Sequence, residues 1–358
     1  MDAGVKAFLA RAYLHGGDVE RSERFYRELL EADAMDVKSL LMLVQLSIRA
    51  EDYAEAERLL ARAEEAGVDP DYLRFERAVL AYLRGEPDVA LDALKKLVAV
   101  RRGDLRAWAL IAMLTGDGRD DATYEQALDA LQDQRAASPD VRLMLAELFI
   151  KREEWARART ELDQAVRMNP RLVRAWELLV NVDFQERKRE LAEDHVRILL
   201  TIDPENYIGN RMLGSFQYDR GQYALAESSF RAALAAKRTA GILNDLAYLL
   251  LLKDETPEEA DALIREALAL EPGNLLCLST RAELRLRQER VEEAVADIQQ
   301  LLAAMPNHAP AMLLAARAYE AREQLEAARE LALLLADRQG ELPPEQQETL
   351  QALLDRLS

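Results

Sequence analysis

The chain has 358 residues, of which half are hydrophobic but only 6% aromatic, and its formal net charge at pH 7 is −18. A surface this acidic repels the phosphates of nucleic acids, so we expect no nucleic-acid partner. The single cysteine, Cys277, excludes an intrachain disulfide, and the three histidines have no metal-ligand spacing. We therefore expect no metal site.

The helix-forming residues Ala, Leu, Glu and Arg dominate the chain, and no sustained run of β-branched residues has a period of two. This composition predicts an all-α protein. The chain opens on the amphipathic segment MDAGVKAFLARAY, which does not read as a signal peptide, and it holds no apolar run long enough to cross a bilayer. We expect no direct membrane insertion, and a cytoplasmic location, or a periplasmic one if a targeting segment has been removed.

A regular period of about 34 residues runs through the sequence, as in helical repeat proteins. Alanine recurs at this step at Ala56, Ala90, Ala158, Ala192, Ala226, Ala260, Ala294 and Ala328, and proline at Pro170, Pro204, Pro272 and Pro306. The period predicts ten units over residues 3–342, with approximate bounds 3–36, 37–70, 71–104, 105–138, 139–172, 173–206, 207–239, 240–274, 275–308 and 309–342. Each unit has the pattern of two amphipathic helices joined by a polar turn.

Some of these repeat units depart from the pattern. In the first, Ser22 stands where alanine is expected. In the fourth, the stretch TGDGRDD predicts a lengthened turn, and the best small residue, Ala127, comes three places late. The fifth follows the pattern: Asn169 and Pro170 end the second helix, because proline cannot donate a helical N–H. Residues 343–358 form a lone helix whose leucine stripe predicts a cap over the last apolar face.

This pattern resembles the tetratricopeptide repeat (TPR) family. Matching residues are Leu145, Ala146, Phe149, Ala158, Ala165 and Pro170 in one unit, Trp176, Leu179, Ala192 and Pro204 in the next, and Leu213, Gly214, Tyr223, Ala226, Phe230 and Ala233 in a third. The resemblance implies a right-handed α-solenoid superhelix of about ten helix-turn-helix units plus a C-terminal capping helix. It also implies that the first helices of the units line a concave groove for protein or peptide segments.

Two short motifs could indicate chemistry, but the repeat explains both. Gly214 and Ser215 lie in the middle of a predicted helix and lack the second glycine of a nucleophile elbow. The TGDGRDD stretch lacks the lysine of a P-loop and the third glycine of a dinucleotide site. We therefore expect no catalytic residue, no cofactor and no enzymatic activity.

Two sets of residues are predicted to face the groove. The first set is polar and aromatic and could bind the backbone or the carboxylate of a peptide: Arg174, Asn181, Phe184, Arg211, Ser215, Tyr218, Asn244 and Tyr248. The alternative is a solvated inner face with ordinary salt bridges. The second set is an apolar contact strip: Leu41, Ile48, Tyr72, Phe75, Val79 and Tyr82. The alternative for the strip is that closure of the superhelix, or a kink at the fourth repeat unit, buries these side chains internally.

The function that these features favour is a non-enzymatic scaffold that binds protein or peptide segments in the groove. The alternative is a structural or self-associating TPR region of a larger bacterial secretion or polysaccharide-export assembly, in which the apolar strip could mediate a homo-oligomer.

Overall fold

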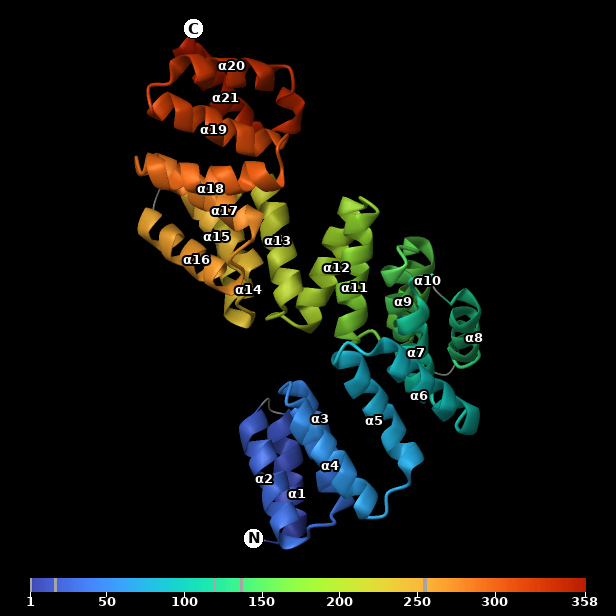
Figure 1. Cartoon of the computed structure of the whole chain (residues 1–358). Helices are drawn as coiled ribbons and strands as arrows, with labels where there is room; N and C mark the ends of the chain where they lie inside the picture. The colour runs from blue at the N-terminus through green and yellow to red at the C-terminus, as the bar shows by residue number, and fades with distance from the viewer. Residues whose placement is uncertain (1, 16–17, 119, 136–137, 254–255) are drawn as a thin grey trace. The chain divides into compact units, whose positions relative to one another are not determined.

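The computed structural model describes residues 2–15, 18–118, 120–135, 138–253 and 256–358, and over these residues it is all-helical (Figure 1). The helices are α1 (Ala3–His15), α2 (Val19–Ala32), α3 (Val37–Arg49), α4 (Tyr53–Glu65), α5 (Pro70–Leu83), α6 (Pro87–Val100), α7 (Leu105–Thr115), α8 (Asp121–Gln132), α9 (Pro139–Lys151), α10 (Trp155–Met168) and α11 (Val173–Gln185). They continue with α12 (Arg189–Ile202), α13 (Tyr207–Asp219), α14 (Tyr223–Ala236), α15 (Ala240–Lys253), α16 (Pro257–Leu270), α17 (Leu275–Arg287), α18 (Val291–Ala304), α19 (Ala309–Ala321), α20 (Leu325–Ala336) and α21 (Pro344–Leu357). A 3₁₀ turn, η1 (Gln339–Glu341), precedes α21.

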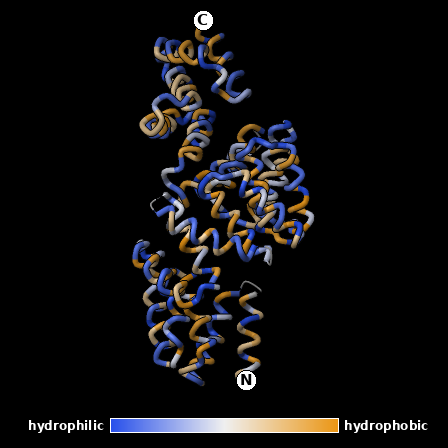
Figure 2. Tube along the Cα trace, turned by 90° about the vertical axis from the view of Figure 1, so that its right-hand side faces the viewer, coloured by the Kyte–Doolittle hydropathy of each residue, from blue (hydrophilic) through white to orange (hydrophobic). Residues whose placement is uncertain are grey.

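Successive helices pack as pairs, for example α3 with α4, α13 with α14 and α15 with α16, and within each unit neighbouring pairs contact each other, as α6 contacts α7 and α14 contacts α15. Hydrophobic and hydrophilic residues alternate along the helices (Figure 2), as expected for helices that bury one face. The predicted all-α solenoid of helix pairs is thereby confirmed. Among the described residues, no helix is both long enough and apolar enough to cross a bilayer.

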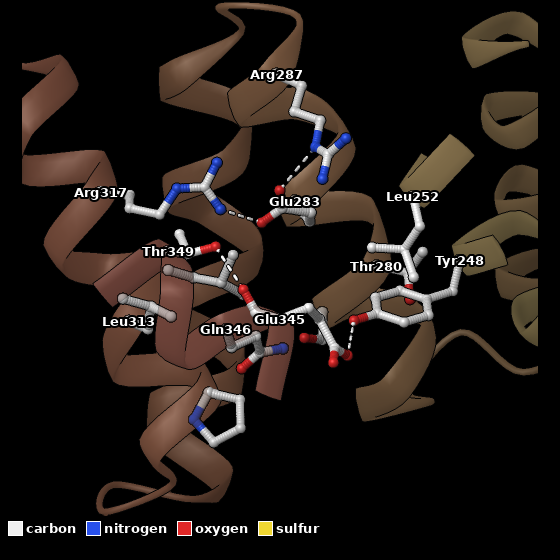
Figure 3. Close-up of a pocket in the computed structure, with 13 residues that line it drawn as sticks. Tyr248, Leu252, Thr280, Glu283, Arg287, Leu313, Arg317, Glu345, Gln346 and Thr349 are labelled. Carbon is white, nitrogen blue, oxygen red and sulfur yellow. Dashed lines mark hydrogen bonds and ion pairs between the residues drawn. The ribbon is translucent and has the colours of Figure 1, made fainter. Parts of the chain in front are cut away.

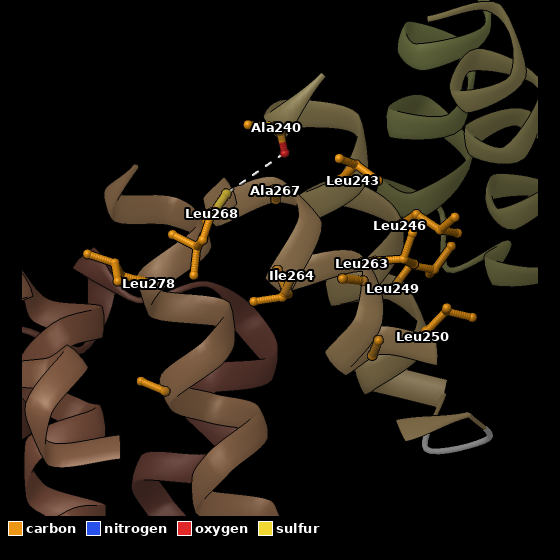
Figure 4. Close-up of a cluster of buried hydrophobic side chains, with 14 of the residues drawn as sticks. Ala240, Leu243, Leu246, Leu249, Leu250, Leu263, Ile264, Ala267, Leu268 and Leu278 are labelled. Carbon is orange, nitrogen blue, oxygen red and sulfur yellow. Dashed lines mark hydrogen bonds between the residues drawn. The ribbon is translucent and has the colours of Figure 1, made fainter. Parts of the chain in front are cut away.

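The chain divides into two compact units, Met1–Leu178 and Leu179–Ser358. The division lies inside α11, and nothing in the repeat period of the sequence marks it. In the second unit, a continuous apolar core runs from α14 to α19, with Leu243, Leu246 and Ile264 among its completely buried members (Figure 4). A separate cluster joins Leu350 and Leu353 of α21 to α19 and α20.

The recurring alanines lie where two helices approach most closely. All eight are at most 1% exposed. Gly214 serves the same purpose on α13, because a Cβ atom added there would lie 2.5 Å from Cδ1 of Phe230 on α14. The small residues therefore set the distance between paired helices, as the sequence predicts.

Turns between the two helices of a repeat contain one residue in the left-handed backbone conformation, which the residue types at that position do not predict. Its φ lies between 58° and 80° at Glu51, Gly85, Glu153, Arg187, Gly221, Glu289 and Glu323, which follow the same repeat period as the alanines. The next N–H then bonds back to a carbonyl five residues earlier, as from Asp52 to Ser47 at 2.9 Å. This is a Schellman turn, which normally favours glycine. Only two of these seven positions are glycine, so the spacing of glycines in the sequence does not show that the turn recurs.

The fourth repeat unit is irregular for a different reason than expected. The linker between α7 and α8 spans 116–120, whereas the linker between α5 and α6 spans 84–86, so the turn is indeed longer; residue 119 lies outside the described residues. Yet α8 stays in register, and Tyr124, not Ala127, occupies the position equivalent to Ala90 of the preceding repeat. Tyr124 is fully buried, and the guanidinium of Arg152 lies 4.2 Å from its ring centroid. The prediction of a shifted Ala127 was wrong, because α7 ends early while α8 keeps its place.

Ser22 offers a test of the alanine position. It occupies the position equivalent to Ala56 of the next repeat and is fully buried, and its hydroxyl has no hydrogen-bond partner in the part of the chain that the structure describes. Replacing Ser22 with alanine should therefore raise the free energy of unfolding by about 1 kcal/mol, because an unsatisfied buried hydroxyl costs roughly that much. Urea unfolding measures the change, with exposed Ser228→Ala as the control. A loss of stability on Ser22→Ala would contradict this account of the position.

Candidate interaction site

The first helices of four successive pairs form the inner face of the second unit. In order they are α13, α15, α17 and α19, and α15 contacts α17 as α17 contacts α19. Arg211, Ser215 and Tyr218 share one face of α13 through spacings of four and three residues. Asn244 and Tyr248 lie four residues apart on α15. The rings of Tyr218 and Tyr248 lie next to each other, with their centroids 6.3 Å apart.

Two of the predicted residues bind one carboxylate of this chain. The hydroxyl of Tyr218 donates to Oε1 of Glu345 at 3.1 Å, and the hydroxyl of Tyr248 donates to the same oxygen at 3.0 Å. Glu345 lies in the first turn of α21, far from both tyrosines in sequence. The inner face therefore already holds an acidic side chain from a helix outside the repeats.

A polar hollow of about 160 Å³ adjoins this contact (Figure 3). Its lining comes from α15, α17, α19 and α21: Tyr248, Leu252, Ser279, Thr280, Glu283, Arg287, Pro310, Leu313, Leu314, Arg317, Glu345, Gln346 and Thr349. Glu283 pairs with Arg317 and, at 2.9 Å, with Nε of Arg287. Arg287 also donates to the carbonyl of Leu251 at 2.7 Å. Glu283 thus fixes both arginines at the edge of the hollow.

Other predicted groove residues bond to neighbouring repeats. Arg211 donates to Asp245 at 2.7 Å. Asn244 is 9% exposed and accepts a hydrogen bond from Thr280 at 2.8 Å. These side chains hold α13, α15 and α17 together, which agrees with the alternative of an inner face with internal pairs.

The remaining groove residues vary in exposure. In the first unit, Arg174 pairs with Glu147 at 3.1 Å and with Glu177 at 3.3 Å. In the second unit, Asn181 is exposed, Phe184 is 59% exposed and Ser215 is half-buried. Of the predicted residues, the structure thus brings Tyr218 of α13 and Tyr248 of α15 together at Glu345.

The apolar strip of the first unit is divided in the structure. Leu41 and Ile48 pack partly against the core of that unit, and they line different hollows. Ile48, Phe75 and Val79 line one hollow of about 250 Å³.

The two tyrosines of the strip are exposed, by 57% at Tyr72 and 38% at Tyr82. The guanidinium of Arg101 lies 3.6 Å from the ring centroid of Tyr72 and covers part of it. Even with Arg101 beside it, Tyr72 remains the more exposed of the two rings.

The side chains that could carry chemistry do not gather on the inner face. Cys277 is buried, and burial together with the nearby Glu271 and Asp245 raises the pKa of its thiol to about 11, so it is a poor nucleophile at neutral pH. His195 and Asp183 form a pair at 2.6 Å between α11 and α12. Over the described residues, no group of three or more His, Cys, Asp or Glu side chains is placed to hold a metal ion.

The contact of Glu345 with Tyr218 and Tyr248 should be detectable in an alkaline titration of the tyrosines. Burial, followed by the charge and hydrogen bond of Glu345, raises the pKa of Tyr248 from 10.0 to about 12, and burial raises the pKa of Tyr218 further. A raised pKa in the folded state means that the contact is complete below pH 10 and is lost as the pH rises through 12. Ultraviolet absorbance of tyrosinate should show that Glu345→Gln lowers the pKa of Tyr248 toward 10. An unchanged titration would contradict the contact; Glu348→Gln is the control.

The comparisons with known proteins agree with this fold. A family model described as tetratricopeptide repeat matches residues 211–274 and 279–343, and a model described as a domain of unknown function (DUF7017) matches residues 71–179. The tetratricopeptide-repeat match lies in the second unit, and together with the helix pairs along the described chain it supports a fold of tetratricopeptide repeats. Its fold is that of a protein-interaction scaffold, which is typically not catalytic.

Similar proteins include the DnaJ homolog subfamily C member 3 of Rattus norvegicus, 26% identical over 277 residues, which are 67% of this chain and 54% of that protein. The Homo sapiens protein of the same name is 24% identical over 275 residues, again 67% and 54%. The chain thus spans about half the length of the curated relatives it matches. The solved APC/C hetero-tetramer Cut9-Hcn1 has a TM-score of 0.54 at 16% identity and covers 99% of this chain and 76% of that one, a likeness of fold alone.

Proposed function

We propose that the inner face formed by α13, α15, α17 and α19 binds a segment of a protein partner. One observation carries the proposal: Tyr218 and Tyr248, from successive repeats, place their hydroxyl groups on one carboxylate oxygen of a helix outside the repeats. Aromatic side chains with a polar tip are favoured at protein interfaces because they combine apolar area with a hydrogen bond. The face therefore has the chemistry needed to hold a segment of another protein.

The test needs a variant that blocks the face without loosening the repeats. Arg211 and Asn244 are unsuitable, because each bonds to a neighbouring helix. Ser215 is half-buried on the same face of α13, so Ser215→Glu adds bulk and a negative charge beside Tyr218. The matched control is Ser228→Glu on α14, where the serine is exposed.

Affinity purification followed by mass spectrometry should recover a partner with the wild type and with Ser228→Glu, but not with Ser215→Glu. The expected loss is at least about tenfold, since a misplaced charge in an interface costs more than about 1.4 kcal/mol. Recovery of the same partners by all three chains would show that this face does not bind them.

A second candidate function is self-association through the apolar strip. The exposure of Tyr72 and Tyr82 supports it, because tyrosine is enriched at interfaces. Light scattering over a concentration series should then show a larger species for the wild type and a monomer for the Tyr72→Glu, Tyr82→Glu double variant. The control is Val89→Glu on α6, where the valine is 57% exposed. A wild-type monomer at every concentration would exclude the strip as a self-association surface.

A further inference from the structure

We propose that the first turn of α21 is a built-in occupant of the inner face, and that the partner segment presents its own carboxylate, which displaces Glu345 from Tyr218 and Tyr248. This inference rests on the proposed function and specifies both the chemistry of the partner and the step that precedes its binding. The ligand group is an aspartate or glutamate side chain, or a C-terminal carboxylate, within a protein segment.

The two ends of α21 are held in different ways. Leu350 and Leu353, at most 1% exposed, join the apolar cluster with α19 and α20. The first turn lies over the inner face, where Glu345 receives the two tyrosine hydrogen bonds. Leu342, which precedes the helix and is 4% exposed, belongs to the same cluster, so only the side chain of Glu345 has to leave the tyrosines while both apolar anchors stay in place.

The charges around the hollow favour a carboxylate as the occupant. Arg287 and Arg317 contribute two positive charges, while Glu283 and Glu345 contribute two negative ones. The lining is therefore neutral only while Glu345 is present. When the carboxylate of Glu345 leaves, the lining has a net positive charge beside two free hydroxyl donors, a combination that prefers an anion over a neutral amide.

The first turn leaves room on the face. A partly open hollow of about 160 Å³ lies beside it, bounded by α15, α17 and α19. Oε1 of Gln346, a residue of this lining, is buried and has no hydrogen-bond partner among the described residues. A partner segment that brings its carboxylate to the tyrosines has this hollow for its neighbouring side chains.

The test uses the full chain and a small carboxylate as the probe. In Glu345→Ala, amide hydrogen exchange across residues 345–349 should be roughly tenfold faster than in the wild type, because hydrogen bonds to a charged group are lost. Propionate should slow this exchange again by occupying the vacated position, whereas propionamide, which has the same shape but no charge, should not. The exposed neighbour Glu348→Ala is the matched control, and it should leave the exchange unchanged.

A second variant guards against an effect of Glu345 on helix stability alone. Tyr218→Phe with Tyr248→Phe keeps both rings and removes only the hydroxyls, so it should speed the exchange of the first turn as Glu345→Ala does. In this double variant propionate should have no effect. Equal rescue by propionate and propionamide, or rescue that persists without the hydroxyls, would overturn the carboxylate site.

The failure of this inference differs from the failure of the proposed function. If Glu345→Ala leaves the amide exchange of the first turn unchanged, Glu345 does not hold α21 on the inner face. A partner whose recovery depends on Ser215 can still exist in that case. If the exchange and the rescue behave as expected but no partner depends on Ser215, the carboxylate site stands and the proposed function is wrong. If both hold, Glu345→Ala should recover severalfold more partner than the wild type, because the internal competitor is gone.

Discussion

Replacing Asp297 with alanine is expected to lower the free energy of unfolding by about 3 kcal/mol, since it removes the buried carboxylate that pairs with two half-buried arginines. Asp297 on α18 is 1% exposed and accepts hydrogen bonds from Arg281 at 2.9 and 2.6 Å and from Arg285 at 2.6 Å. Both arginines come from α17, so this cluster fastens the two helices of one repeat. Urea unfolding of the full chain measures the change.

Two further variants separate the charge cluster from a general effect on α18. Gln300→Ala changes an exposed residue of the same helix and should alter stability by less than about 0.5 kcal/mol. The triple variant Arg281→Met, Arg285→Met, Asp297→Leu removes all three charges at once and should stay near wild-type stability, because a buried ion cluster is often no better than apolar packing. A triple variant as unstable as Asp297→Ala would contradict this explanation.

Replacing Gly214 with alanine should destabilise the second unit by about 1 to 3 kcal/mol, because the new Cβ would meet a buried ring. The atom would lie 2.5 Å from Cδ1 of Phe230, whose side chain is 3% exposed. Phe230→Ala alone should cost about 3 to 5 kcal/mol through the cavity it leaves. In the Phe230→Ala background, however, Gly214→Ala should be neutral or stabilising by up to about 1 kcal/mol, because alanine favours a helix over glycine.

Gly214→Ala is thus expected to destabilise the wild type but not the Phe230→Ala variant, and this difference identifies the contact between the two positions. A double-mutant cycle on urea unfolding should give a coupling of at least about 1 kcal/mol between the two positions. Additive effects would show that Gly214 is needed for a reason other than its distance from Phe230.

The helix pairs could be predicted from the sequence because a small residue at the closest contact recurs at the same position of most repeats, and each recurring alanine is buried in the structure. The irregular fourth repeat could not be predicted. A tyrosine occupies the alanine position there, and only the structure shows that Tyr124 stays buried under Arg152 while α7 ends early. The Schellman turns were also hidden, because glutamate or arginine holds the left-handed position in five of the seven described turns.

The candidate site was predicted in part. Helical spacing places Arg211, Ser215 and Tyr218 on one face of α13, but it cannot tell which donors are free. Arg211 is taken by Asp245 of the next repeat, whereas Tyr218 points to Glu345, 127 residues later in the chain. The leucine stripe of residues 343–358 indicates where that helix packs, but no periodicity shows that its first turn reaches the inner face. Contacts of this kind depend on tertiary structure alone.

The inner face of the second unit thus consists of arginine–carboxylate pairs between repeats, with two tyrosine hydroxyls left for a carboxylate that no repeat supplies. The most direct test is the recovery of the partner by three full-length chains under identical conditions. Glu345→Ala should recover the most partner, the wild type less, and Ser215→Glu at least about tenfold less than the wild type. Equal recovery by all three chains would contradict a binding face that α21 occupies.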